Sequence, residues 1–202
     1  EAMKRLFSIL FGAGLVLAGL LGVLSATVLP ALGIQVRVPW WEVWRLWPLA
    51  IIGLGLFLTL LGLFSLSKRG MGALFIPAVP VLALGVILLY TSVFDAWAFW
   101  SFAWTLLILA VALGFSLAAL FSRQVWFGIP AVIIGLNGAA LAFTSLTGWW
   151  SAWSVLWTVE PLALGLTLLL VFVGTRSLPV LVVGLAFCGL ALFSFLGMLG
   201  IL

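Results

Sequence analysis

The stretch from Leu49 to Phe64 reads LAIIGLGLFLTLLGLF, with no charged side chain and a single hydroxyl, that of Thr59. An amphipathic surface helix would place polar residues on one face, at every third or fourth position. A strand of a membrane β-barrel would alternate in polarity over about ten residues. Because this stretch does neither and is apolar all round, it predicts a helix that is surrounded by lipid.

The composition of the whole chain agrees with that interpretation. Of its 202 residues, 67% are hydrophobic and 6% are charged, and the mean hydropathy is +1.48. A soluble domain carries about 25% charged residues. The absence of histidine and the single cysteine exclude a histidine-based catalytic triad, a typical zinc site and a histidine-ligated haem. We therefore expect an integral membrane protein that is not an enzyme and needs no cofactor.

Short polar clusters divide the chain into seven apolar segments, each long enough to cross a bilayer as a helix of about 20 residues. The gaps between the segments are too short to hold a soluble domain. The predicted fold class is therefore an all-α polytopic membrane protein with seven transmembrane helices. The segments are Leu6 to Leu32, Leu46 to Leu66, Met71 to Val93, Phe99 to Phe121, Val125 to Leu146, Leu156 to Val173 and Leu178 to Leu202.

The basic residues predict the orientation, because cytoplasmic loops of membrane proteins are enriched in lysine and arginine. With the amino terminus in the cytoplasm, six of the eight basic residues lie inside, and only Arg37 and Arg45 lie outside. We expect the first apolar segment, which follows Lys4 and Arg5, to remain as a signal anchor. The carboxyl terminus then lies outside. The basic residues stand singly or in pairs beside the spans, so no nucleic-acid partner is expected.

After the first segment a similar unit recurs three times, at intervals of about 50 to 55 residues. Each unit has a tryptophan triplet, a descending helix, a basic turn and a returning helix with the pattern Pro-x-x-x-x-Gly. This order predicts an anchor helix (1–39) and three helical hairpins (40–94, 95–148 and 149–202). The triplets are Trp40, Trp44 and Trp47; Trp97, Trp100 and Trp104; and Trp150, Trp153 and Trp157, and the proline–glycine pairs are Pro80 and Gly85, Pro130 and Gly135, and Pro179 and Gly184.

The tryptophans of each triplet share one helical face, and they cluster at the predicted outer ends of the hairpins. Eleven of the twelve tryptophans lie on that side, whereas an aromatic belt normally serves both membrane interfaces. In one interpretation the indole rings anchor the helices at headgroup depth. In the other, the three faces form an outward platform that binds a partner, a lipid or a flat hydrophobic ligand.

Few polar side chains interrupt the apolar segments. Glu160, near the start of the sixth segment, is either an acid that suits the helix dipole or a functional acid within the membrane. Asn137 is expected to form a hydrogen bond between helices, with a transport site as the alternative, and Asp95 is expected to cap the start of the fourth helix. Small residues expected to allow close helix packing are Gly14, Ala18, Gly22, Gly85, Gly135 and Gly184.

The stretch from Trp44 to Gly55, WRLWPLAIIGLG, resembles the tryptophan–proline helix start of the LiaI/LiaF-like transmembrane family of bacterial envelope proteins. The resemblance covers residues 7–66, with weaker echoes at 104–107 and 160–163. A second, weaker likeness is to acid-resistance membrane proteins of the HdeD type. Both imply a multi-pass protein of the bacterial cytoplasmic membrane without catalytic activity. The sequence has no counterpart of the soluble LiaF-type carboxyl-terminal domain, so no kinase-inhibiting activity is implied.

These observations lead us to expect a non-enzymatic protein that acts by association, as a structural, regulatory or accessory subunit of an envelope-stress or bioenergetic assembly. The expected partners are membrane lipids and other membrane protein subunits. In a bioenergetic assembly, lipid, quinone or pigment would lie between the apolar helices. The alternative is a small transporter or channel, which the scarcity of ionisable residues within the segments disfavours.

Overall fold

A computed structural model describes residues 12, 14, 16, 19, 20, 40–63 and 71–200, without the side chains of residues 40–42 and 71. Every element in this part of the chain is helical, which confirms the predicted all-α class. The elements are η2 (Trp40–Leu46), α3 (Pro48–Leu63), η4 (Met71–Leu74), α4 (Phe75–Phe94), η5 (Trp97–Phe99), α5 (Trp100–Ser122), η6 (Val125–Phe127), α6 (Gly128–Thr147), η7 (Trp150–Ala152), α7 (Trp153–Leu156), α8 (Val159–Thr175) and α9 (Leu178–Leu199).

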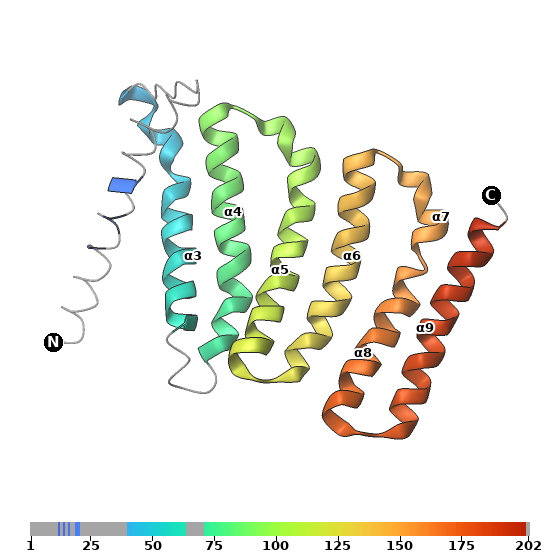
Figure 1. Cartoon of the computed structure of the whole chain (residues 1–202). Helices are drawn as coiled ribbons and strands as arrows, with labels where there is room; N and C mark the ends of the chain where they lie inside the picture. Colours follow the sequence, from blue (N-terminus) through green and yellow to red (C-terminus); the bar gives the residue numbers. More distant parts are fainter. Residues whose placement is uncertain are drawn as a thin grey trace.

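The long helices stand side by side in a single layer, in the order α3, α4, α5, α6, α8 and α9 (Figure 1). The most extensive contacts join α3 to α4, α5 to α6, and α8 to α9, so these pairs are antiparallel hairpins. Fewer contacts join α4 to α5, and fewer still join α6 to α8. The described helices therefore form an open row, in which each helix packs mainly against its neighbours along the chain.

Five helices in the described part of the chain are long and apolar enough to cross a membrane, which indicates a multi-pass membrane protein. They are Val43–Leu63, Gly72–Phe94, Trp97–Ser122, Val125–Thr147 and Leu178–Leu199. Trp150–Leu156 and Val159–Thr175 meet at an angle of 47°, and they make a sixth crossing if the bent pair is counted as one span. This break lies inside the predicted continuous segment from Leu156 to Val173. The predicted segment from Leu6 to Leu32 and the basic turn at 67–70 lie outside the described residues, apart from five positions of the former.

Glycines bring the two helices of a hairpin into close contact. A Cβ built on Gly55 would lie 2.8 Å from the backbone of Leu82, and one built on Gly85 would lie 2.8 Å from the backbone nitrogen of Ile52. In the last hairpin a Cβ on Gly165 would lie 2.8 Å from the backbone nitrogen of Cys188. Small residues of this kind let helix backbones approach within a membrane.

Equivalent features recur 53 residues apart along the row. Left-handed residues end α4 and α6 at Asp95 and Gly148, and they end α5 and α8 at Arg123 and Arg176. Both intervals are 53 residues. Buried threonines follow the same interval, because Thr91 and Thr144 lie on the returning helices, and Thr105 and Thr158 lie near the starts of the descending ones. In this register Trp44 and Trp47 correspond to Trp97 and Trp100, and Gly85 corresponds to Gly138.

Candidate functional site

The tryptophan triplets lie at one end of the row, which we call the tryptophan end. It contains η2, η5 and η7, where the three descending helices begin (Figure 1). Because α4 stands between α3 and α5, and α6 stands between α5 and α8, the structure does not bring the triplets into one cluster. The exposed members are Trp44, Trp47, Trp97, Trp150 and Trp157, the half-buried ones are Trp100, Trp104 and Trp153, and the side chain of Trp40 lies outside the described residues.

Hydrogen bonds of the indole nitrogens differ between two tryptophans of the second triplet. The Trp104 Nε1–H donates to the carbonyl oxygen of Ser101 at 3.0 Å. The Trp100 Nε1 atom is buried and has no hydrogen-bond partner in the described part of the chain. In the first triplet the guanidinium of Arg45 lies 5.9 Å from the centre of the Trp44 ring, which is a cation–π distance.

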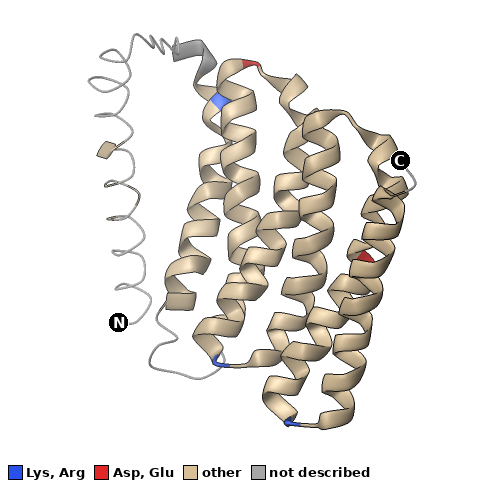
Figure 2. Cartoon of the chain, turned by 45° about the vertical axis from the view of Figure 1, so that its right-hand side comes forward, with Lys and Arg blue, Asp and Glu red and all other residues tan. Residues whose placement is uncertain are grey.

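Charged residues lie mainly at the two ends of the row (Figure 2). Arg123 and Arg176 occupy the turns that follow α5 and α8, at what we call the arginine end. Asp95 follows α4 at the tryptophan end, where the sequence predicted it to cap the start of the next helix. That prediction is wrong: Asp95 is the left-handed residue that ends α4, with φ of 52°, and its backbone N–H donates to the carbonyl oxygen of Thr91. Its φ places it outside the helical region, so it terminates one helix instead of starting another.

Glu160 lies in the first turn of α8, just after the break that separates α7 from α8. Its side chain is exposed, and the described residues include no ion pair or side-chain hydrogen bond for it. A rise of 1.5 Å per residue places it about 24 Å along the helix from Arg176. The carboxylate is thus far along the helix from the basic turn that follows α8.

Asn137 is half-buried on α6. Its Nδ2 atom donates to the carbonyl oxygen of Ile133 at 3.1 Å, one turn earlier on the same helix. The described hydrogen bond is therefore local, and it does not join two helices.

The predicted small-residue positions differ in how closely they are packed. Gly85 and Gly184 are buried at helix crossings. A Cβ on Gly135 would meet only the Cβ of Ala112, at an ordinary 3.5 Å, whereas one on Gly138 would lie 3.0 Å from Leu109. Gly14 is exposed with nothing within 4 Å of its added Cβ, and Ala18 and Gly22 lie outside the described residues.

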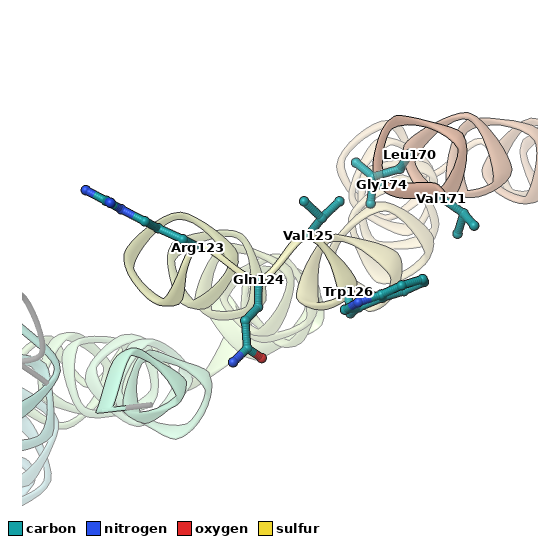
Figure 3. A pocket seen from close by; sticks show the side chains of 7 residues that line it. All are labelled: Arg123, Gln124, Val125, Trp126, Leu170, Val171 and Gly174. Atoms are coloured by element: carbon teal, nitrogen blue, oxygen red, sulfur yellow. The ribbon is translucent and has the colours of Figure 1, made fainter. Parts of the chain in front are cut away.

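A groove opens at the arginine end, where η6 and the turn before it approach the last part of α8 (Figure 3). Its volume is about 240 Å³. Trp126 lies on the same side as α8, whereas the Arg123 side chain extends in the opposite direction (Figure 3). The lining residues are Arg123, Gln124, Val125, Trp126, Leu170, Val171 and Gly174, and we call this space the arginine-end groove.

A second hollow of about 290 Å³ lies beside the break between α7 and α8, against α9. Its walls are almost entirely apolar, and they include Leu156, Leu162 and Phe195. Cys188 also contributes to the wall, and the Thr158 hydroxyl already donates to the carbonyl oxygen of Val155. This hollow could accept an apolar group, but its lining does not indicate which one.

No group of three or more histidine, cysteine, aspartate or glutamate residues in the described part of the chain could hold a metal ion. No protein-family model, curated protein or solved structure matches the chain. The described part of the chain presents an apolar helical layer with a groove at its basic end, an aromatic end and, in α8, the exposed Glu160.

Proposed function

We propose that this chain is a non-enzymatic protein of the bacterial cytoplasmic membrane that acts by association, as a structural, regulatory or accessory subunit of a membrane assembly. The observation that carries the proposal is the single-layer row, which leaves large apolar side chains exposed along the described helices. On α9 the Phe193 side chain is 77% exposed, and Val182, Leu192 and Leu196 are also exposed. Helices in lipid associate through steric fit, so such surfaces suit other transmembrane helices.

The proposal includes an architecture of seven transmembrane helices, with a cytoplasmic amino terminus and an outer carboxyl terminus. We also propose that the three hairpins are copies of one repeated unit. The recurring 53-residue interval between helix-ending residues supports the repeat. The positions of Arg123 and Arg176 at one end support the orientation, because arginine is enriched on the cytoplasmic side.

Site-specific photo-crosslinking in the native membrane tests association. A photoreactive residue at the exposed Phe193 position is expected to give a protein adduct of defined mass and constant stoichiometry. The matched control is the buried Ala191 position on the same helix, where only crosslinks within the chain are expected. Lipid adducts alone at Phe193, together with a single-chain particle after mild solubilisation, would overturn the proposal.

Cysteine labelling tests the orientation. In a Cys188→Ala background, Ser151→Cys at the tryptophan end is expected to react in intact cells with a membrane-impermeant thiol reagent. Gln124→Cys at the arginine end is expected to react only after the membrane is permeabilised. The reverse pattern would show the opposite orientation and leave the association proposal standing.

One observation favours a small transporter as a second candidate. The third descending helix is broken, and an acid stands in the first turn after the break. Discontinuous helices and acids within the membrane mark ion pathways in transporters. Proton flux into liposomes that contain the purified chain tests this candidate. A flux that Glu160→Gln abolishes and Asp95→Asn retains would favour transport over association.

A further inference from the structure

Successive hairpins meet at two junctions in the described row, and the first is filled by aromatic rings. In this first junction, between α4 and α5, Phe75 is 2% exposed. Its ring stacks on that of Phe121, with 4.8 Å between the ring centres and an angle of 29° between the planes. The two rings thus close the arginine end of the first junction.

The second junction lies between α6 and α8, and its helices end at equivalent positions. It lacks this ring pair. A shift of 53 residues, which relates Arg123 to Arg176, places Gly128 at the position of Phe75 and Gly174 at the position of Phe121. At both positions, therefore, the second junction has a glycine, which carries no ring.

A leucine on α8 occupies part of the space that the glycines leave. A Cβ on Gly128 would lie 2.7 Å from the Leu170 Cδ2 atom, and the residue equivalent to Leu170 in the first junction is also a leucine, Leu117. Leu170 is therefore no larger than its counterpart, whereas Val125 and Val171 are larger than theirs, which are Gly72 and Ala118. Around Gly174 nothing lies within 4 Å of an added Cβ, and this open space is part of the arginine-end groove. Glycine thus lines the groove at the position where the first junction has an aromatic residue.

The lining of the groove changes from apolar to polar toward the end of the row. Val125, Leu170 and Val171 form an apolar wall, and the Trp126 indole, which is 58% exposed, stands beside them. Arg123 and Gln124 form the rim at the helix ends. Figure 3 shows that the Arg123 side chain extends away from the apolar part of the groove, so it does not contribute charge to the interior.

Charge and size narrow the class of ligand. The two described charged residues at the arginine end, Arg123 and Arg176, are both positive, which favours an anionic head group. A volume of about 240 Å³ is below the range of about 300 to 1,000 Å³ typical of sites that enclose a whole cofactor or drug-sized molecule. A single flexible hydrocarbon chain suits this space better than a ring system.

We propose that the arginine-end groove holds one acyl chain of an anionic phospholipid, whose phosphate lies at the surface near Arg123. Trp126 then contacts the chain and the ester region, where indole rings are favoured. The bound acyl chain fills the space in the second junction that corresponds to the space filled by the aromatic pair in the first. This site does not depend on the association function or on the orientation of the protein.

Native mass spectrometry of the full chain, released from a mild detergent with defined lipids, tests the site. The probes are phosphatidylglycerol and phosphatidylcholine with identical acyl chains. The wild-type chain is expected to retain one phosphatidylglycerol molecule more strongly than phosphatidylcholine, by about fivefold for one arginine near the surface. Gly174→Phe, which restores the residue found at position 121, is expected to reduce retention of both lipids by about tenfold or more, as an order-of-magnitude estimate for loss of the acyl-chain site.

Two matched controls separate the groove from general effects. Gly189→Phe on α9 adds the same ring at another open, helical glycine outside the groove, and it is expected to retain lipid like the wild type. Arg123→Gln is expected to remove the preference for phosphatidylglycerol and keep retention through the acyl chain, whereas Arg176→Gln is expected to retain the preference. Gly174→Leu serves as a smaller filling variant, and thermal unfolding verifies that each variant is folded.

Equal lipid retention by folded Gly174→Phe and Gly189→Phe chains would overturn the proposal. A Gly174→Phe effect on the fraction of dimer, without an effect on lipid, would show that a second copy covers the groove and would also overturn it. Retention without any preference for the anionic lipid, or a preference that Arg123→Gln leaves intact, would refute the assigned head group.

Discussion

The junction of α4 with α5 and that of α6 with α8 bring equivalent helix ends together, but they fill the space at the arginine end differently. In the first, Phe75 and Phe121 stack at 4.8 Å, and α5 approaches closely at Gly114, where an added Cβ would lie 2.7 Å from the Phe75 carbonyl oxygen. In the second, glycines occupy both ring positions and a groove remains. Lipid tails are as apolar as the side chains, so helices in a membrane are held mainly by contact between fitted surfaces.

We infer that the two junctions have separate roles, one in stability and the other in binding. We expect the tightly fitted rings to make the first junction the more stable one, because contacts between α4 and α5 are more extensive than those between α6 and α8. The second junction gives up part of that contact and gains a space that a lipid chain can enter. Stability and binding capacity are thus divided between equivalent positions of one architecture.

The largest expected effect is that of Phe75→Ala, which removes the buried member of the ring pair. Deleting a buried phenylalanine side chain costs about 3 to 5 kcal/mol, because apolar contacts are lost and a cavity remains. We expect the free energy of unfolding to fall by about this amount in reversible unfolding from bicelles. Phe143→Ala, at a site on α6 that is 42% exposed, is the matched control and should change the free energy of unfolding by less than about 1 kcal/mol.

If both substitutions lower the free energy of unfolding equally, the two junctions cannot be distinguished by their stability. In that case the first junction would derive no special stability from its aromatic pair. The hollow second junction would then not be the weaker of the two.

A pair of glycine substitutions is expected to have opposite signs in the two junctions. Gly114→Ala should destabilise the chain by about 1 to 3 kcal/mol, because the new methyl group meets backbone that cannot move independently. Gly174→Ala adds a methyl group to open space within a helix, and it should stabilise by up to about 1 kcal/mol. Denaturation midpoints of the two variants, measured under one set of conditions, test the contrast. If both substitutions change the stability in the same direction, the packing at the two junctions is alike.

The sequence was sufficient to predict the elements that depend on composition. Long apolar segments predicted the helices of the row within a few residues, because the cost of placing polar groups in lipid limits where a helix can end. The pattern Pro-x-x-x-x-Gly named Gly85, which is buried at a close helix contact, and also Gly135, where an added Cβ would make only an ordinary contact at 3.5 Å. In the last returning helix the same pattern located Gly184, which is buried against α8.

Other features that depend on the fit between helices were not found from the sequence. Gly114 and Gly174 are both ordinary glycines within apolar segments, yet one touches backbone and the other borders open space. The break between Leu156 and Val159 and the termination of α4 at Asp95 were also missed. Apolar patterns describe the preference of a segment for lipid and contain little information on its backbone angles. The 53-residue register would have been the signal for the groove, because it aligns two glycines with two phenylalanines.

The smallest expected effect concerns the hydroxyl of Thr167, which stands in the second junction where the first has Gly114. Its side chain is 8% exposed, and its Oγ1 atom has no hydrogen-bond partner in the described part of the chain. An unpaired buried hydroxyl is unfavourable, so the isosteric Thr167→Val should stabilise the chain by up to about 1 kcal/mol. Thr144→Val is the matched control, because the Thr144 hydroxyl donates to the carbonyl oxygens of Ala140 and Leu141. Thermal unfolding should show a higher midpoint for the first variant than for the second. The reverse order would mean that the Thr167 hydroxyl has a partner in the membrane, and a bound lipid at the second junction would be the first candidate to examine.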